Sequence, residues 1–198
     1  MVCLLRFDKA QLLAKIEQLS AHDRTVFAAA IAERMLGAYA KYSSRTGRGN
    51  PIQLREILAR LWADLAGAPI SEGEVDIMIE EAAGLIPGED DRPWVLEQGS
   101  AEDAVSAVLY SLRSLKSGLP AEAAWASTCA GDALDDFVIN RDDIDTNVPG
   151  SWARVVADPL MQAELARQHR DLEELLQGTA TVQVLRERSK SEALQFIS

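Results

Sequence analysis

TVFAAAIAERMLGAYAKYSSRTGRGNPIQLREILARLWADL, residues 25–65, is the stretch that decides the fold. Its apolar side chains recur at steps of three and four residues, the spacing of one face of an α-helix. Gly47 interrupts this pattern, and glycine is favoured where a helix ends in a left-handed conformation. Asn50 and Pro51 then supply an N-cap and a first-turn residue for a second helix. The stretch predicts two amphipathic helices joined by a glycine-rich turn, with apolar faces formed by Phe27, Ala30, Ile31, Met35, Ala38 and Tyr42 and by Leu54, Ile57, Leu58, Leu61, Trp62 and Leu65.

Helical periodicity continues on both sides of this stretch, and the alternating pattern of a strand is almost absent. Polar residues that cap helices precede the apolar stripes at Asp8, Ser20, Ser71, Ser100 and Asp158. The predicted helices are 8–19, 20–47, 50–65, 71–85, 100–118, 120–139 and 158–188, with a helical turn at 152–157 and an interruption at Gly178.

Short connections between amphipathic helices are typical of a bundle of antiparallel neighbours. We therefore expect an all-α fold in which residues 1–198 form a single all-helical domain. The bundle would contain about seven helices and end with a long C-terminal helix. The pattern of residues 189–198 is ambiguous and fits an irregular tail.

The composition is that of a folded, acidic protein. The chain has 198 residues, 47% of them hydrophobic, and a net charge of −11. Such a chain repels phosphate backbones, so we expect no nucleic-acid partner. The two cysteines, Cys3 and Cys129, indicate free thiols in a reducing compartment. Because the sequence lacks a signal peptide and any run of about 20 apolar residues, we expect a cytoplasmic protein with no membrane partner.

Several residues of the opening stretch form a distinctive combination: Glu33-Arg34-Met35, Thr46-Gly47-x-Gly49, Arg55 and Trp62. This combination resembles the YjaG-like family of uncharacterised bacterial proteins, a domain of unknown function. The resemblance returns at Ile86-Pro87, Asp103-Ala104, Ser117-Gly118 and Asp158-Pro159 and is weakest from 130 to 156. It implies an all-helical fold, and it implies no catalytic residue, substrate or cofactor.

The glycine turn is the first candidate for a site. A glycine turn that leads into a helix N-terminus points backbone N–H groups outward and can bind an anion. Basic residues surround it, because no acid occurs between Arg34 and Arg55. An anionic ligand would contact Arg45, Arg48, Asn50 and Arg55. The alternative is a structural turn, in which the glycines relieve backbone strain and the basic residues favour the end of the preceding helix.

Arg34 is the second candidate, because the spacing places it on the apolar face of its helix. A buried guanidinium needs a carboxylate partner, or it costs several kcal/mol. Asp64, at the edge of the apolar face of the next helix, is the predicted partner in a structural ion pair. A ligand-binding role for Arg34 is the alternative.

Acidic residues are the third candidate. Asp132, Asp135 and Asp136 share one face of a helix at positions i, i+3 and i+4. Paired helical carboxylates could hold Mg²⁺ in a phosphohydrolase, but the Glu-x-x-His motifs of a di-iron bundle are absent. The Asp143-Ile-Asp145-Thr-Asn147 segment begins like a calcium loop and lacks its later glycine and glutamate. We interpret the acids as a solvated helix face and assign no metal ligand.

These patterns favour a non-enzymatic protein-interaction or regulatory module that acts on an unknown protein partner without a cofactor. A binder of a small anionic ligand at the Gly47–Asn50 turn is the alternative, and a Mg²⁺-dependent phosphohydrolase is the weaker one. A contiguous exposed apolar patch would favour the first, and a pocket with converging guanidinium groups would favour the second. The oligomeric state stays open, with a homodimer among the alternatives.

Overall fold

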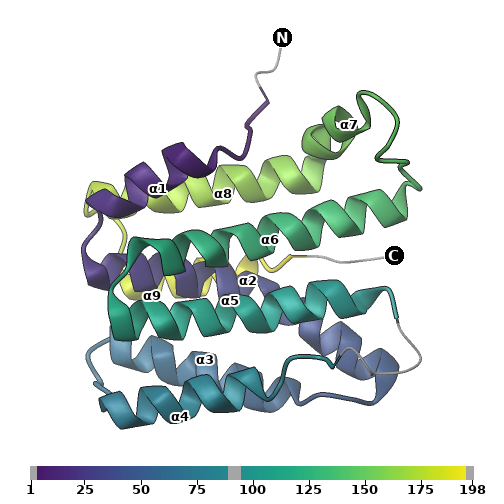
Figure 1. The fold of residues 1–198 in the computed structure, drawn as a ribbon. Helices are drawn as coiled ribbons and strands as arrows, with labels where there is room; N and C mark the ends of the chain where they lie inside the picture. Colours follow the sequence, from purple (N-terminus) through teal and green to yellow (C-terminus); the bar gives the residue numbers. More distant parts are fainter. Residues whose placement is uncertain (1–3, 89–94, 195–198) are drawn as a thin grey trace.

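The computed structural model describes residues 4–88 and 95–194. Over these ranges the chain forms nine helices and no strands, as Figure 1 shows. The helices are α1 (Lys9–Gln18), α2 (Ala21–Thr46), α3 (Pro51–Leu65), α4 (Glu72–Ala83), α5 (Glu97–Ser117), α6 (Pro120–Arg141), α7 (Ser151–Ala157), α8 (Pro159–Leu176) and α9 (Val182–Ser191). The all-helical prediction is therefore confirmed, and the expected number of about seven helices was too low.

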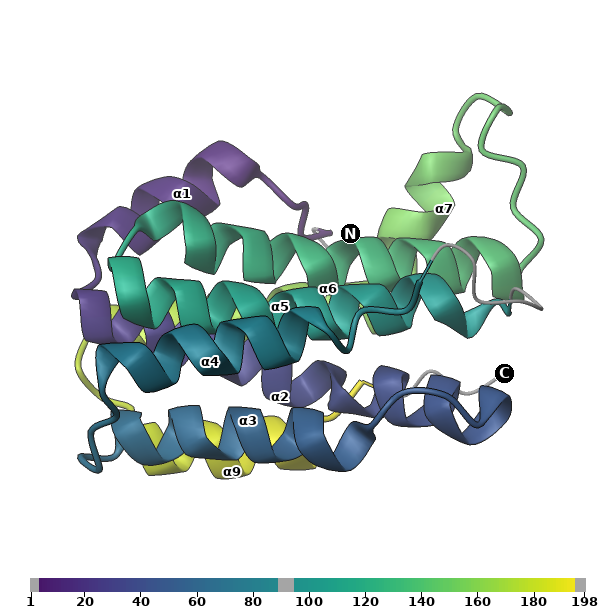
Figure 2. The ribbon, with the colours of Figure 1, turned by 60° about the horizontal axis from the view of Figure 1, so that its bottom comes forward.

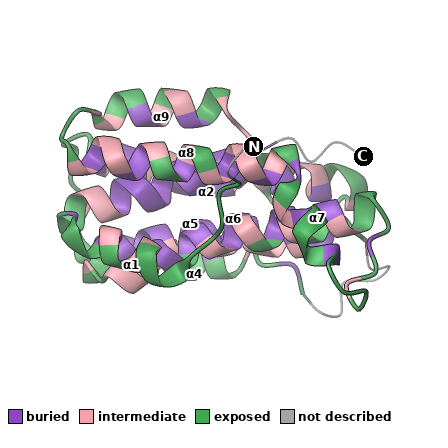
Figure 3. Cartoon of the chain, turned by 90° about the horizontal axis from the view of Figure 1, so that it is seen from above, coloured by how far each residue is buried: buried purple, intermediate pink, exposed green. Residues whose placement is uncertain are grey.

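Helix α2 is the centre of the structure. It packs against α3, α5, α6, α8 and α9, whereas α4 lies on α5, and α1 lies on α6 and α8. Figure 2 shows α3 and α4 on the opposite side of α5 from α1. In Figure 3, the middle of α2 is buried, and α1 and α9 expose their outer faces. The main hydrophobic core therefore lies around α2, and a small second cluster of Val138, Ile144 and Val155 fills the space between α6 and α7.

Local capping chemistry explains most helix boundaries. Asp8, Ser20, Asn50, Ser71 and Asp158 each accept a backbone hydrogen bond at the N-terminus of the helix that follows, as predicted. The exposed first-turn amides of a helix make such acceptors stabilising. These five helix starts therefore follow from short-range sequence signals.

Two predicted boundaries are wrong. Ser100 lies inside α5, which begins at Glu97, and its hydroxyl donates to the Glu97 carbonyl oxygen at 3.2 Å. A carboxylate is favourable in a first helical turn, and Glu97 also pairs with Arg45 of α2. The predicted long C-terminal helix is two helices, because Gly178 adopts a left-handed conformation with a φ of 64°. Thr181 then caps α9, which turns back onto α2.

Candidate functional site

At the Gly47–Asn50 turn, the predicted anion site, backbone N–H groups donate hydrogen bonds to other groups of the protein. The Asn50 N–H donates to the Tyr39 hydroxyl oxygen at 3.2 Å, and the Arg48 N–H donates to the Thr46 hydroxyl oxygen at 3.2 Å. The Asn50 side chain accepts from the Gln53 N–H at 3.1 Å, as an N-cap does. The turn therefore has a clear structural role.

The basic residues around this turn separate in the structure. Arg45 donates to Glu97 Oε1 at 2.6 Å, so its charge is neutralised locally. Arg48 lines a different hollow, of about 310 Å³, together with Tyr39. Arg55 lies exposed on the surface of α3. The arrangement of Arg45 and Arg48 in different cavities does not match the convergent basic pocket that an anion would favour.

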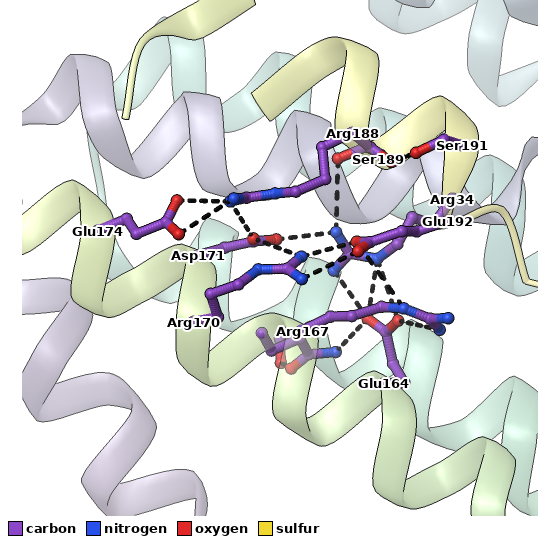
Figure 4. A network of polar contacts seen from close by, with 12 residues as sticks. Arg34, Glu164, Arg167, Arg170, Asp171, Glu174, Arg188, Ser189, Ser191 and Glu192 are labelled. Atoms are coloured by element: carbon purple, nitrogen blue, oxygen red, sulfur yellow. Dashed lines mark hydrogen bonds and ion pairs between the residues drawn. The ribbon is translucent and has the colours of Figure 1, made fainter. Parts of the chain in front are cut away.

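Arg34 is completely buried, as the sequence predicts, but its partners are not the predicted Asp64. Arg34 Nη2 donates to Glu164 Oε1 at 2.8 Å, and its Nη1 donates to Asp171 Oδ2 at 2.9 Å. Both acids project from α8 (Figure 4). Asp64 instead accepts the Ile70 N–H at 2.9 Å and so stabilises the connection between α3 and α4. Short acidic side chains near a helix end often accept backbone N–H groups of the segment that follows, and Asp64 does so here.

A second layer of ion pairs surrounds Arg34 and joins α8 to α9 (Figure 4). Arg188 contacts Asp171 at 2.8 Å and Glu174 at 2.7 Å, and Arg170 contacts Glu192 at 2.6 Å. The network contains four arginines (34, 167, 170 and 188) and four carboxylates (164, 171, 174 and 192), so it is charge-balanced. Such balance is what burial of charges requires.

The protonation of Arg34 follows from this network. Burial lowers the pKa of Arg34, but the negative charges of Glu164 and Asp171 outweigh that effect and raise the pKa above its ordinary value. Arg34 therefore stays charged and satisfied. Sequence reasoning missed its partners, although Glu164 and Asp171 follow the seven-residue spacing of one helix face and share that face with the buried Met161 and Leu172.

A cavity of about 110 Å³ lies between the N-terminal segment, α6, α7 and α8; we call it the α6–α8 cavity. Its walls are mainly apolar, and carboxylates line part of it. It is lined by Phe7, Thr128, Gly131, Asp132, Asp135, Trp152, Val156, Met161, Glu164, Leu165 and Gln168. A mainly apolar pocket with a few polar groups is the usual form of a small-molecule site.

Two acids of α6, Asp132 and Asp135, have raised pKa values. Burial and the neighbouring charges of Asp132 and Asp136 raise the pKa of Asp135 to about 6. Burial and Asp136 likewise raise the pKa of Asp132. On α5, burial and the same acids raise the pKa of Asp103 to about 7. Asp132 and Asp136 are exposed, as expected of a solvated helix face, and Asp135 is half-buried beside them. Their like charges repel one another.

The N-terminal segment 4–8 is held across this region by one side chain. The Leu5 N–H donates to Gln162 Oε1 at 2.9 Å, and Gln162 Nε2 donates to the Leu5 carbonyl oxygen at 2.9 Å. Phe7 lines both the α6–α8 cavity and a wider groove of about 550 Å³ between this segment, α1 and α8. Leu4 and Leu5 line the same groove, so exposed apolar side chains are contiguous here.

The remaining candidate residues bear on metal binding and on nucleophilic chemistry. Within residues 4–88 and 95–194, no group of three or more histidine, cysteine or acidic side chains is placed to hold a metal ion. Cys129 is buried, and burial with the charges of Asp103 and Asp132 raises its pKa to about 12, so it is a poor nucleophile. Cys3 and Trp94 lie outside the described residues. None of the described helices is long and apolar enough to cross a membrane.

Comparisons with known proteins identify the family and the fold. A family model described as "Protein of unknown function (DUF416)" matches residues 11–195. The crystal structure of a DUF416 family protein from Shewanella baltica OS155 is similar, with a TM-score of 0.78 and 20% sequence identity. The similarity covers 91% of this chain and 92% of that chain, and at this identity it supports the fold alone. A comparison with curated proteins gave no match.

Proposed function

The chain belongs to the DUF416 family of proteins of unknown function, and from its own geometry we propose that it is a non-enzymatic protein-interaction or regulatory module. Its interaction surface is the N-terminal face, which we define as the segment 4–8, α7 and the adjoining side of α8. The YjaG-like resemblance supports a bacterial, cytoplasmic protein.

The observation that carries this proposal is a group of exposed apolar side chains that line connected hollows. Leu4, Leu5 and Phe7 are 43%, 38% and 41% exposed and line the groove of about 550 Å³. Trp152 is 51% exposed and shares the α6–α8 cavity with Phe7. Contiguous exposed apolar surface of this kind marks interaction sites, whereas single exposed residues do not. Aromatic side chains are also the commonest anchors of protein interfaces.

The charge of this face indicates the chemistry of the partner. Asp132 and Asp135 line the α6–α8 cavity beside Trp152, and the whole chain carries a net charge of −11. Complementary charge steers association and disfavours wrong partners. The partner surface would therefore combine apolar anchors with lysine or arginine side chains.

A quantitative pull-down from bacterial extract tests this proposal with three forms of the full chain. Trp152→Ser removes an exposed anchor of the N-terminal face, and Ile52→Ser removes a 69% exposed apolar side chain from α3 as the matched control. We expect a protein that the wild type and Ile52→Ser recover and that Trp152→Ser loses at equal thermal stability. Direct titration with the purified partner must reproduce the difference. Identical recovery by all three forms contradicts the proposal.

One observation keeps the anionic-ligand alternative as a second candidate. Arg48 lines a hollow of about 310 Å³ with Tyr42 and the conformationally special Gly49. A thermal-shift titration with phosphate and citrate measures any stabilisation, since a ligand of the folded state raises the melting temperature. A saturable shift that Arg48→Ala abolishes supports this alternative. An unchanged melting temperature excludes it for these anions.

A further inference from the structure

The α6–α8 cavity is large enough for an organic group. A cavity holds one water molecule when its volume is about 10–15 Å³. Measured in the same way, the volume of this cavity is about 110 Å³. Val156, Met161 and Leu165 form apolar walls, and the aromatic rings of Phe7 and Trp152 complete the lining. The cavity therefore suits a compact apolar body better than a hydrated ion.

The carboxylates of this cavity differ in how they are compensated. Glu164 is 1% exposed, and Arg34 neutralises it through donors to both of its oxygens at 2.8–3.0 Å. Gln168 also donates to Glu164 at 3.0 Å. The carboxylates of Asp132 and Asp135, in contrast, have no hydrogen bond or ion pair with any residue of 4–88 and 95–194. The uncompensated negative charge of the cavity thus comes from α6.

We propose that the α6–α8 cavity binds a small organic cation, a primary ammonium group carried on an apolar body. The ammonium group contacts Asp132 and Asp135, and the apolar body packs against Trp152, Phe7 and Met161. Aromatic rings add to this preference, because they attract organic cations through their negative faces. An anionic ligand would be repelled by the same two carboxylates.

The electrostatic state of α6 supports this assignment. Burial and neighbouring carboxylates disfavour the charged forms of Asp132 and Asp135, and a bound cation relieves that repulsion. A divalent metal is a poorer fit, since no three ligating side chains in the described part of the chain are placed around one point. A ligand with a single positive charge needs fewer ligating groups, so it fits the pair of Asp132 and Asp135 better.

Binding should depend on pH. The pKa of Asp135 is raised to about 6 by burial, Asp132 and Asp136. The same two acids also raise the pKa of Asp103 on the neighbouring helix α5. Glu164 of α8 and Arg6 and Asp8 of the N-terminal segment are charged groups that line the connected hollows. Below pH 6, protonation of Asp135 removes half of the uncompensated charge. Affinity for an ammonium ligand therefore falls between pH 7.5 and pH 5.

Calorimetric titration of the full chain with three matched probes tests the proposal. The probes are phenethylammonium, the neutral 2-phenylethanol and the anionic phenylacetate, at pH 7.5 and physiological salt. We expect saturable binding of phenethylammonium and at least about tenfold weaker binding of the other two, a difference of one decade in dissociation constant. A lysine with blocked termini is a fourth probe, because its affinity relative to phenethylammonium shows whether the ammonium comes from a free amine or a protein side chain.

Two charge-matched double variants locate the site. Asp132→Asn with Asp135→Asn keeps the shape of the cavity and should weaken binding of phenethylammonium about tenfold or more. Glu80→Gln with Glu81→Gln removes the same charge from the exposed surface of α4 and should leave the affinity unchanged.

The proposal is overturned if phenethylammonium at about 10 mM shows no binding, because that result excludes a dissociation constant of about 1 mM or tighter. It is also overturned if the three matched probes bind equally, or if both double variants bind equally well. The aspartate variants retain Phe7 and Trp152, the apolar anchors of the proposed protein interface. Loss of cation binding in these variants therefore tests the cavity proposal separately from recovery of a protein partner.

Discussion

Trp62 Nε1 donates a hydrogen bond of 2.8 Å to Glu33 Oε2, and this bond joins α3 to the central helix α2. Trp62 is completely buried, and Glu33 is 8% exposed. Both residues belong to the combination on which the family resemblance depends. Glu33 and the adjacent Arg34 therefore leave α2 in different directions, one to α3 and the other to α8.

Trp62→Phe removes the only hydrogen-bond donor of the Trp62 side chain and leaves a buried carboxylate oxygen of Glu33 without this partner. An unsatisfied buried polar group costs about 1–3 kcal/mol, and more if it is charged. We expect a loss of free energy of unfolding of at least about 1–3 kcal/mol in urea denaturation. Trp125→Phe, at a 40% exposed position, is the control and should change stability by less than about 0.5 kcal/mol. Equal effects of the two substitutions would contradict this role of the bond.

Arg34→Met should destabilise the protein by about 3–5 kcal/mol, because it leaves Glu164 and Asp171 buried without their counter-charge. Chemical denaturation of the single variant measures this cost. A triple variant that adds Glu164→Gln and Asp171→Asn should recover part of the loss, since it removes the unbalanced charges. Unchanged or higher stability of Arg34→Met would show that the ion pairs are not essential.

Gly49→Ala should destabilise the protein more than Gly47→Ala. Both glycines have left-handed backbones, with φ values of 75° and 70°, and an alanine there costs about 1–2 kcal/mol. A Cβ atom at Gly49 would also lie 2.6 Å from the Tyr39 hydroxyl oxygen, whereas nothing lies within 4 Å of one at Gly47. Displaced Tyr39 would lose its hydrogen bond to the Leu85 carbonyl oxygen at 2.9 Å. Melting temperatures of the two variants measure the difference, and equal values would show that the turn tolerates the contact.

Asp103→Asn should stabilise the protein at pH 8 and have little effect at low pH. Burial, Asp132, Asp136 and Glu102 raise the pKa of Asp103 in the folded state to about 7, above its ordinary value of 3.8. The folded state then binds the proton more tightly, so stability is highest below the ordinary pKa and falls as pH rises through 7. The variant lacks this loss and should be more stable by about 1–2 kcal/mol at pH 8, after allowance for solvent screening.

Urea denaturation of the wild type and Asp103→Asn at pH 5, 6, 7 and 8 measures this dependence. The slope of stability against pH should be shallower in the variant over this range. Parallel curves would mean that Asp103 does not titrate there and that the α5–α6 acids repel each other less than their positions indicate.

Short-range chemistry made much of the fold predictable from sequence. The caps at Ser20, Asn50 and Ser71 and the left-handed end of α2 at Gly47 depend on residues within one turn of each other. Helices α2 and α3 accordingly have nearly the predicted bounds. The separation of α8 from α9 was harder to predict, because a glycine such as Gly178 is tolerated within many helices. Gly178 ends α8 here because the following helix, α9, packs back against α2, a contact between distant parts of the chain.

The candidate sites were less predictable because they depend on contacts between distant parts of the chain. Burial of Arg34 follows from its place in the apolar stripe, but its acceptors lie 130 and 137 residues away. The sequence instead favoured Asp64, on the next helix, as the partner of Arg34. In the structure, Asp64 accepts a backbone hydrogen bond in the segment that follows α3. The α6–α8 cavity likewise combines Phe7 with Trp152, and no sequence pattern connects these two residues.

The position of the Arg34 network has a consequence for synthesis on the ribosome. Arg34 is translated early, yet Glu164 follows it by 130 residues and Ser189 by 155. At about 5–20 residues per second, roughly 10–30 s pass before all these partners emerge. During that interval α2 carries the Arg34 charge, which cannot be buried without its counter-charges. The nascent helices α2 to α6 should therefore stay exposed to chaperones and proteases until α8 and α9 have been synthesised.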